Sequence, residues 1–192
     1  MPRPRAFDTE QVLDAATDVF WRKGYAATTP QDLCDATGLG RGSLYNAFEG
    51  KRELFDRVLE RYNQRGSLKQ LAILDESRPV RERIRGLLLT TMDNAAPGVS
   101  RAGCLAVSTA VQLAGTDSKL AEVLRKRFGE TESALFAAIE YGQASGEIRA
   151  DIPARALARM VISTMYGMTV LATTFDDREQ LADVVEAAIA AL

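Results

Sequence analysis

The chain has 192 residues, enough for one medium domain or for a small domain fused to a larger one. Its 46% hydrophobic and 26% charged residues are ordinary for a globular protein and argue against disorder. The net charge of −2 excludes binding to nucleic acid through overall charge, so any such binding must depend on where Lys and Arg are placed locally.

Histidine is absent, which removes the commonest metal ligand and the usual general base of an enzyme. The two cysteines, Cys34 and Cys104, lie far apart without CxxC spacing, so a zinc site is not expected. The composition therefore argues against an enzyme, and we predict no metal and no cofactor.

No apolar run approaches the ~20 residues that a membrane-spanning helix needs. Residues 1–5 are not followed by the apolar core of a signal peptide. We therefore expect a cytoplasmic protein that has no membrane partner.

Capping signals delimit the predicted helices. Asp8 is a candidate N-cap and Gly24 a C-terminal stop, while Thr29 and Pro30 begin a short second helix that Gly38 ends. Alternation of the kind that marks β-hairpins is not found. The sequence predicts an all-α protein with helices at about 9–23, 30–37, 41–48, 51–75, 79–95, 101–114, 117–145, 153–174 and 177–191.

The second and third helices, joined by a Gly-containing turn, form a helix-turn-helix unit. The spacing Gly-x-x-x-Gly-x-Leu-Tyr-x-x-Phe-x-x-Lys-x-x-Leu-Phe runs without a gap from Gly38 to Phe55. Together with residues 19–25, this segment resembles the DNA-binding segment of the TetR family of transcriptional regulators, over about residues 8–56. The resemblance implies an N-terminal three-helix DNA-binding domain, residues 1–50, and a C-terminal helical ligand-binding and dimerisation domain, residues 51–192.

The third helix is the candidate recognition helix, which must enter a major groove about 12 Å wide. Arg41 at its start is suited to guanine O6 and N7, and Gly42 permits close approach of the backbone. Short polar side chains suit base edges or phosphates, and helix N-termini favour phosphate. The predicted DNA-binding residues are Thr29, Arg41, Gly42, Ser43, Tyr45, Asn46 and Lys51.

The last two predicted helices carry apolar residues at helical spacing, and helix 153–174 is apolar on two faces. This pattern suits a four-helix dimer interface, as the resemblance implies, although a monomeric bundle core gives the same pattern. The predicted interface residues are Leu157, Val161, Leu181, Val185, Ala188 and Ile189.

The resemblance also implies a pocket for a small-molecule effector between the middle helices. Aromatic and Met side chains suit an adaptable apolar cavity, although each is individually expected more often in a plain core. The candidate wall residues are Leu88, Met92, Cys104, Val107, Val111, Phe128, Phe136 and Met165.

The sequence thus predicts a ligand-responsive regulator, of the repressor type. As a homodimer it would bind palindromic double-stranded operator DNA, and a small apolar or aromatic effector would release it. One alternative is a repressor that senses electrophiles or oxidants through Cys104, which lies in a Gly-Cys-Leu stretch resembling one branch of the family. Two others are a DNA-binding protein without a ligand and an enzyme using acidic residues. The last is disfavoured because Asp117, Glu130, Glu132 and Glu140 show no paired spacing and resemble a solvated helix face.

Overall fold

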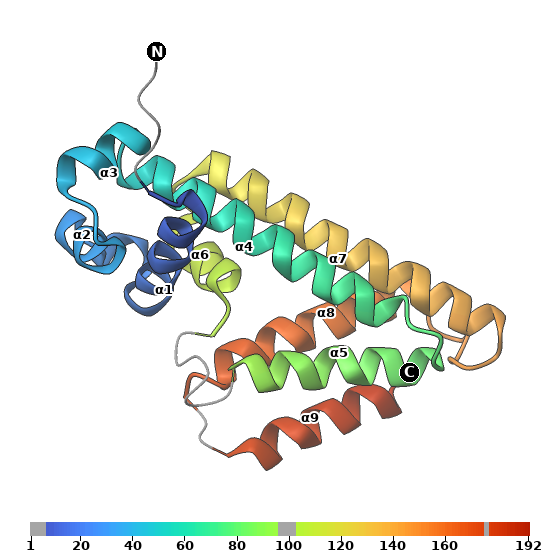
Figure 1. The fold of residues 1–192 in the computed structure, drawn as a ribbon. Coiled ribbons are helices and arrows are strands. Elements are labelled where there is room, and N and C mark those ends of the chain that lie inside the picture. The colour runs from blue at the N-terminus through green and yellow to red at the C-terminus, as the bar shows by residue number, and fades with distance from the viewer. Residues whose placement is uncertain (1–6, 96–102, 175–176) are drawn as a thin grey trace. The chain divides into compact units, whose positions relative to one another are not determined.

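The structure is a computed structural model and describes residues 7–95, 103–174 and 177–192 (Figure 1). Over these ranges it contains nine helices and no strand, which confirms the all-α prediction. None of the described helices is both long and apolar enough to cross a bilayer. The helices are α1 (Thr9–Ala27), α2 (Pro30–Thr37), α3 (Arg41–Ala47), α4 (Lys51–Leu74), α5 (Val80–Ala95), α6 (Leu105–Leu113), α7 (Ser118–Ala144), α8 (Ala154–Leu171) and α9 (Arg178–Ala190).

The chain divides into two compact units, Met1–Gln64 and Arg65–Leu192, and the division falls within α4. The sequence placed the domain boundary earlier, between residues 50 and 51. The first half of α4 belongs with the N-terminal unit because its apolar residues are buried in that unit's core. Phe55, for example, packs edge-on against Phe20 of α1, with ring centroids 4.9 Å apart.

The N-terminal unit contains α1, α2, α3 and the first half of α4. The caps form as predicted: the Asp8 side chain accepts from Glu10 N at the start of α1, and Gly24 interrupts the helical backbone with φ of 73°. The guanidinium of Arg61 on α4 pairs with Glu10 and Asp14 on α1, at 2.6 and 2.8 Å. These ion pairs hold α4 against α1 within the N-terminal unit.

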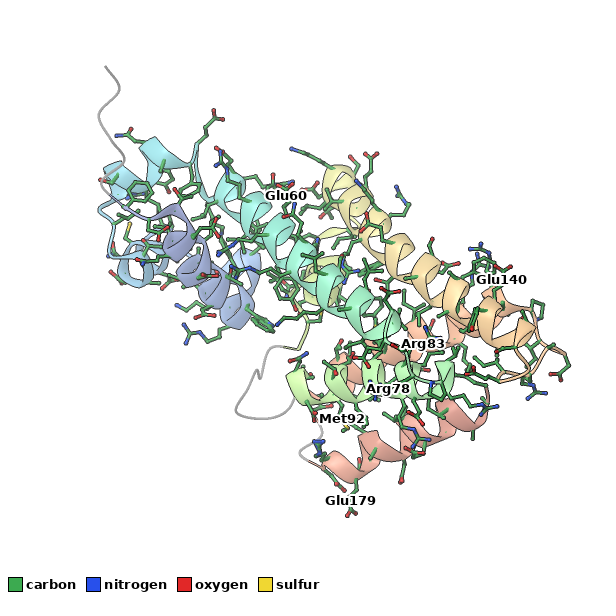
Figure 2. All side chains as sticks on the ribbon, turned by 45° about the vertical axis from the view of Figure 1, so that its right-hand side comes forward. Glu60, Arg78, Arg83, Met92, Glu140 and Glu179 are labelled. Carbon is green, nitrogen blue, oxygen red and sulfur yellow. The ribbon has the colours of Figure 1, made fainter. Side chains whose placement is uncertain are left out.

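The C-terminal unit is built around α5, which contacts α7, α8 and α9. Its core includes Ile84 and Met92 of α5, whereas Glu140 on α7 is exposed (Figure 2). The guanidinium of Arg81 on α5 bonds both the α7–α8 connection and α9, donating to the backbone oxygens of Glu147 at 2.9 Å and Ile189 at 3.0 Å. The unit therefore has a continuous apolar interior of its own.

Helix α6 begins at Leu105, later than the predicted 101. Gly103 precedes it with φ of 65°, a backbone conformation that side chains rarely adopt. A Cβ atom there would lie 2.8 Å from the backbone oxygen of Thr169, so the chain passes closely against α8 at this point. Residues 101 and 102 lie outside the described residues.

Candidate DNA-binding site

Reciprocal hydrogen bonds fix the start of α2. The Thr29 hydroxyl accepts from Asp32 N at 3.2 Å, and Asp32 Oδ2 accepts from Thr29 N at 2.9 Å, which forms a capping box. Lys23 Nζ donates to Asp32 Oδ1 at 2.7 Å. The Lys23 hydrogen bond and those from Thr29 lower the pKa of Asp32 to about 2, so its carboxylate is charged at neutral pH.

A glycine turn connects α2 to α3. Gly38 closes α2 in the left-handed region, with φ of 69°, and its N–H donates to Cys34 O at 3.0 Å. Gly40 is the N-cap of α3 and supplies no side-chain cap. The turn thus contributes backbone geometry alone, and the orientation of α3 depends on its buried residues.

Two buried apolar residues, Leu44 and Phe48, anchor α3 in the core of the N-terminal unit. The opposite side of the helix presents polar and small residues to solvent: Arg41, Gly42, Ser43 and Asn46 are all exposed. Within the part of the chain that the structure describes, the side chains of Ser43 and Asn46 make no hydrogen bond. Their donors and acceptors are therefore available to an external partner.

Tyr45 is half-buried beside this exposed side of α3. The Arg41 guanidinium lies over its ring at 5.9 Å from the centroid. Such a cation–π contact orients the arginine while leaving its hydrogen-bond donors exposed. A Cβ atom at Gly42 would meet nothing within 4 Å, so the N-terminal unit itself does not need a glycine there.

Lys51, at the first position of α4, is engaged inside the N-terminal unit. Its ammonium donates to Thr28 O at 2.7 Å and lies 4.4 Å from the centre of the Tyr25 ring. Burial lowers the pKa of Lys51. Tyr25, which the sequence did not single out, also packs on Phe55 at 4.8 Å. Its position directly after the Gly24 helix stop is the sequence signal that could have identified Tyr25.

The seven predicted DNA-binding residues therefore all lie in the N-terminal unit, but their surroundings differ. Four lie exposed on α3, Tyr45 lies beside them, and Thr29 and Lys51 mark the starts of α2 and α4. No measured contact with DNA tests their roles, which stay predictions.

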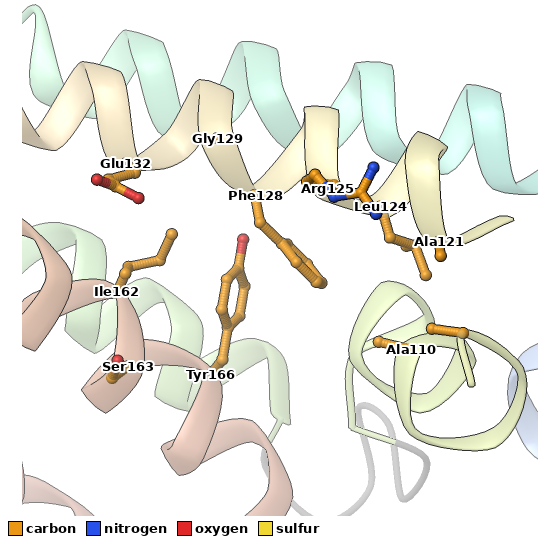
Figure 3. Close-up of a pocket in the computed structure, with 11 residues that line it drawn as sticks. Ala110, Ala121, Leu124, Arg125, Phe128, Gly129, Glu132, Ile162, Ser163 and Tyr166 are labelled. Atoms are coloured by element: carbon orange, nitrogen blue, oxygen red, sulfur yellow. The ribbon is translucent and has the colours of Figure 1, made fainter. Parts of the chain in front are cut away.

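A separate cavity of about 470 Å³ lies in the C-terminal unit, between α6, α7 and α8 (Figure 3). Its apolar wall includes Leu124 and Phe128 of α7 and Ile162 and Tyr166 of α8. The rings of Phe128 and Tyr166 meet there, with centroids 4.8 Å apart. The full lining is Ala110, Ala114, Ala121, Leu124, Arg125, Phe128, Gly129, Glu132, Ile162, Ser163 and Tyr166.

Of the eight predicted pocket residues, Phe128 lines this cavity and the other seven do not. Val111 points to solvent and is 80% exposed, which removes it as a wall residue. The remaining six fall into two groups: Leu88, Met92 and Met165 are buried in the core, whereas Cys104, Val107 and Phe136 are partly buried. Helical spacing indicates which side of a helix is apolar, but it does not show whether an apolar residue lines a cavity or packs in the core.

All six predicted interface residues are buried within the single chain: Leu157, Val161, Leu181, Val185, Ala188 and Ile189. These side chains belong to the core of the C-terminal unit, in which α8 contacts α5, α7 and α9, and α9 contacts α5 and α8. They expose little surface on the single chain, and no contact with a second chain tests their assignment to an interface, which stays a prediction.

Comparison with known proteins gives a consistent result. The model of "Bacterial regulatory proteins, tetR family" matches residues 12–58, and the "Tetracyclin repressor-like, C-terminal domain" model matches residues 80–188. The chain is 30% identical to the HTH-type transcriptional repressor ComR of Escherichia coli, over 93% of this chain and 86% of ComR. It is 29% identical to the uncharacterised regulator YezE of Bacillus subtilis over the full length of both.

A solved structure is also similar. It is that of the TetR family transcriptional regulator CifR, in a cysteine-mutant form, complexed with 26-base-pair double-stranded operator DNA. The TM-score is 0.87 and the identity 31%, covering 98% of this chain and 99% of that one.

Proposed function

The chain belongs to the TetR family of bacterial regulatory proteins, and from this premise we propose that it is a repressor whose operator binding a small molecule relieves. Family membership makes it a DNA-binding regulator of transcription rather than an enzyme. The observation that carries the proposal is the exposed side of α3, with Arg41, Ser43 and Asn46 over a buried apolar anchor. The similarity to CifR, solved on operator DNA, supports the same role for this surface.

Arg41 is the proposed base-reading residue. It begins α3, where recognition helices meet base edges, and its planar guanidinium can bond guanine O6 and N7 together. Ser43 and Asn46 lie on the same exposed side, and Tyr45 supports Arg41 from beside it. Thr29 stands at the start of α2, where backbone N–H groups favour phosphate.

Lys51 is proposed as a phosphate contact that also anchors α4. One donor of its ammonium is used on Thr28 O, which leaves two for an external oxygen. The test is the salt dependence of operator binding for Lys51→Gln. A phosphate contact predicts a slope smaller by about 1 in log–log form. Weaker binding with an unchanged slope would assign Lys51 to anchoring alone.

We propose that the protein acts as a homodimer and that the exposed sides of α8 and α9 form the interface. On α8, Val170 is 50% exposed and Leu171 is 39% exposed. A Cβ atom at Gly167 would meet nothing within 4 Å, so the chain's own packing does not require a glycine there. Exposed apolar and small residues on one helix side suit close packing against another helix.

Sedimentation of Val170→Asp tests this interface. We expect a monomer with weakened operator binding, because a charge would be buried at an apolar contact. Val111→Asp is the matched control, since Val111 is 80% exposed on α6 outside the proposed interface. A folded Val170→Asp protein that remains dimeric would place the interface elsewhere.

The cavity of the C-terminal unit is the proposed effector site. Its volume lies in the range of small-molecule sites, and its wall is mainly apolar with aromatic side chains. A ligand can change operator affinity only by binding the DNA-competent and incompetent states differently. We therefore expect the effector to be a small molecule with an apolar or aromatic body.

A thiol switch is the second candidate, and the position of Cys104 favours it. Cys104 is the N-cap of α6, follows the tightly fixed Gly103, and interacts electrostatically with Tyr166 of the cavity wall. A covalent adduct on the thiol would therefore act on the same wall as a reversible ligand. A quinone that releases operator DNA from the native protein but not from Cys104→Ser would establish this alternative.

The whole proposal is tested by selecting bound DNA from a random pool. Two-fold protein symmetry predicts a near-palindromic site with half-sites about 34–36 Å apart, or a multiple of one helical turn. Screening small molecules for release from the selected site then tests the effector response. Selection that enriches no symmetric site would contradict the proposal.

A further inference from the structure

Arg127 on α7 is a buried cation whose hydrogen-bond partners are all neutral. The residue is 8% exposed. Its guanidinium donates to the Thr131 hydroxyl and to Gln70 Oε1, the latter at 2.6 Å. Among the residues that the structure describes, no Asp or Glu forms an ion pair with it. A buried charge is normally paired, because leaving water without a countercharge is costly.

The groups around Arg127 do not supply that countercharge. The Thr131 hydroxyl also donates to Gln70 Oε1 at 3.3 Å, and Gln70 Nε2 reaches Met165 Sδ at 3.9 Å. Amide, hydroxyl and thioether groups satisfy individual donors but do not neutralise a guanidinium. We call Gln70, Arg127, Thr131 and Tyr166 the buried polar cluster.

Tyr166 connects this cluster to the cavity. Its ring lines the cavity beside the ring of Phe128 (Figure 3). Burial raises the pKa of Tyr166, while the Thr131 hydrogen bond and the charge of Arg127 act in the opposite direction. Arg127 does not itself line the cavity, and its charge acts on the cavity wall through Tyr166.

We propose that the effector is an amphipathic anion whose carboxylate pairs with Arg127, while its apolar body lies between Phe128 and Ile162. The inference rests on the proposed effector function of this cavity and names the chemistry of its ligand. Entry of the carboxylate moves the Tyr166 side chain aside, and the guanidinium fork then holds both carboxylate oxygens.

The other end of the cavity favours the same orientation. Glu132 lines it there and pairs with Arg155 at 3.3 Å and with Arg159 at 3.0 Å. These two solvated arginines are already engaged with Glu132, so a carboxylate at this end would have to compete with Glu132 for them and would gain little. Arg125 also lines the cavity but is exposed, so water already solvates its charge and an anion gains less from it.

The test uses three carboxylates as probes: 4-phenylbutyrate, 1-naphthylacetate and decanoate. Each is compared with its own alcohol and primary amide, which keep the apolar body and remove the charge. Binding is followed by the shift in melting temperature and by release of fluorescent operator DNA. We expect carboxylates to bind the native protein about ten- to a hundredfold more tightly than their neutral analogues.

Arg127→Met is the decisive variant, and Lys126→Met is its matched control, because Lys126 is exposed on the same helix outside the cavity lining. Arg127→Met should fold with an unchanged or higher melting temperature, because it replaces an uncompensated buried charge with an apolar chain. It should lose the preference for carboxylates and keep the binding of the alcohols. Lys126→Met should behave as the native protein, and Arg125→Met, which removes the other arginine near the ligand, should keep the preference for carboxylates.

Gln70→Glu provides an internal counterpart of the ligand. A carboxylate at this position would pair with Arg127, so we expect a higher melting temperature and weaker operator binding without any added compound. A lower melting temperature would show that Arg127 already has its countercharge, and would overturn the inference.

Four further results would overturn it: no response to any of the three carboxylates, no preference over the alcohols, an unfolded Arg127→Met protein, or a loss confined to Arg125→Met. Operator binding by the ligand-free native protein is measured first. If that binding is intact and only neutral compounds release the DNA, the proposed function holds and the anionic effector is wrong.

Discussion

The two units differ in whether the polar side chains proposed for function are exposed or buried. In the N-terminal unit, the polar residues of α3 are exposed over a buried apolar anchor. In the C-terminal unit, Arg127 and Thr131 are buried and bonded to one another. A surface of the first kind is accessible to a partner too large to enter the protein, whereas an interior of the second kind is accessible only to a small molecule. Substitutions on the exposed side of α3 should therefore change DNA affinity with little effect on stability. Substitutions among the buried polar residues of the C-terminal unit should change stability and effector response together.

The largest effect is expected for Val185→Asp on α9. Val185 is fully buried in the core of the C-terminal unit, and an unpaired carboxylate there should lower the free energy of unfolding by at least about 3 kcal/mol. Circular dichroism during heating should show that this unit has lost its cooperative transition. Ala137→Asp, at an exposed position of α7 outside the proposed interface, is the control and should stay folded. A well-folded Val185→Asp monomer would instead support the original placement of Val185 at the dimer interface.

Phe55→Ala tests whether the N-terminal unit depends on its own core. The Phe55 ring packs against Phe20 and Tyr25, and its removal should destabilise this unit by about 3–5 kcal/mol. Operator binding should be lost while the C-terminal unit keeps its helical signal and its probe binding. If both units lost structure together, they would form one cooperative block and the comparison between them would fail.

The helices of both units could be predicted because their ends carry local signals. Asp8, Thr29, Gly38 and Asp117 act as caps through contacts with residues two to four positions away, which the sequence displays directly. The helix start that differs most from the prediction, that of α6, depends on the approach of Gly103 to Thr169. That contact joins segments far apart in the chain, and no local pattern contains it.

The candidate sites also differ in whether the local sequence or long-range packing determines them. The exposed side of α3 could be predicted from a short motif, because helical spacing over the seven residues of this helix determines which positions are buried. The cavity wall depends on how α6, α7 and α8 meet, so spacing found Phe128 but missed Tyr166, Leu124 and Ile162. Periodicity also could not tell whether an apolar side of α8 or α9 packs in the chain's own core or against a second copy, and the structure places Leu157 and Ile189 in that core.

Arg41→Ala should act on DNA affinity alone. Removal of a guanidinium that reads guanine should weaken specific binding by about 1–3 kcal/mol and relax base preference at one position of each half-site. The melting temperature should hardly change, since Arg41 is exposed and its one recorded contact is with the Tyr45 ring. Fluorescence anisotropy with single-base operator variants measures both effects. Unchanged affinity and preference would remove Arg41 from the reading surface.

Gly42→Ala should move stability and DNA affinity in opposite directions. Its Cβ atom would meet nothing in the protein, and alanine is the better helix former by about 0.5–1 kcal/mol. The N-terminal unit should therefore melt slightly higher while operator binding weakens, because the added methyl group separates the backbone of α3 from the DNA. Improved stability with unchanged affinity would mean that the backbone at Gly42 does not approach the groove.

The smallest effect is expected for the capping box of α2 at low pH. The pKa of Asp32 is lowered to about 2 from an unperturbed 3.8. A carboxylate with a lowered pKa stabilises the folded state above its unfolded value, and this contribution is lost as the pH falls from about 4 towards 2. The melting temperature of the native protein should thus exceed that of Asp32→Asn by a small constant amount above about pH 4.

Below that pH the difference between the two proteins should shrink, because protonation removes from native Asp32 the charge that the Asn variant never has. Asp35→Asn, on the same helix, leaves the contacts of Asp32 with Thr29 and Lys23 in place and is the control. The Asp32 side chain is partly exposed to solvent, so added salt should reduce the difference as well. A difference that persists unchanged at pH 2 would mean that the amide geometry of Asn, and not the missing charge, weakens the cap.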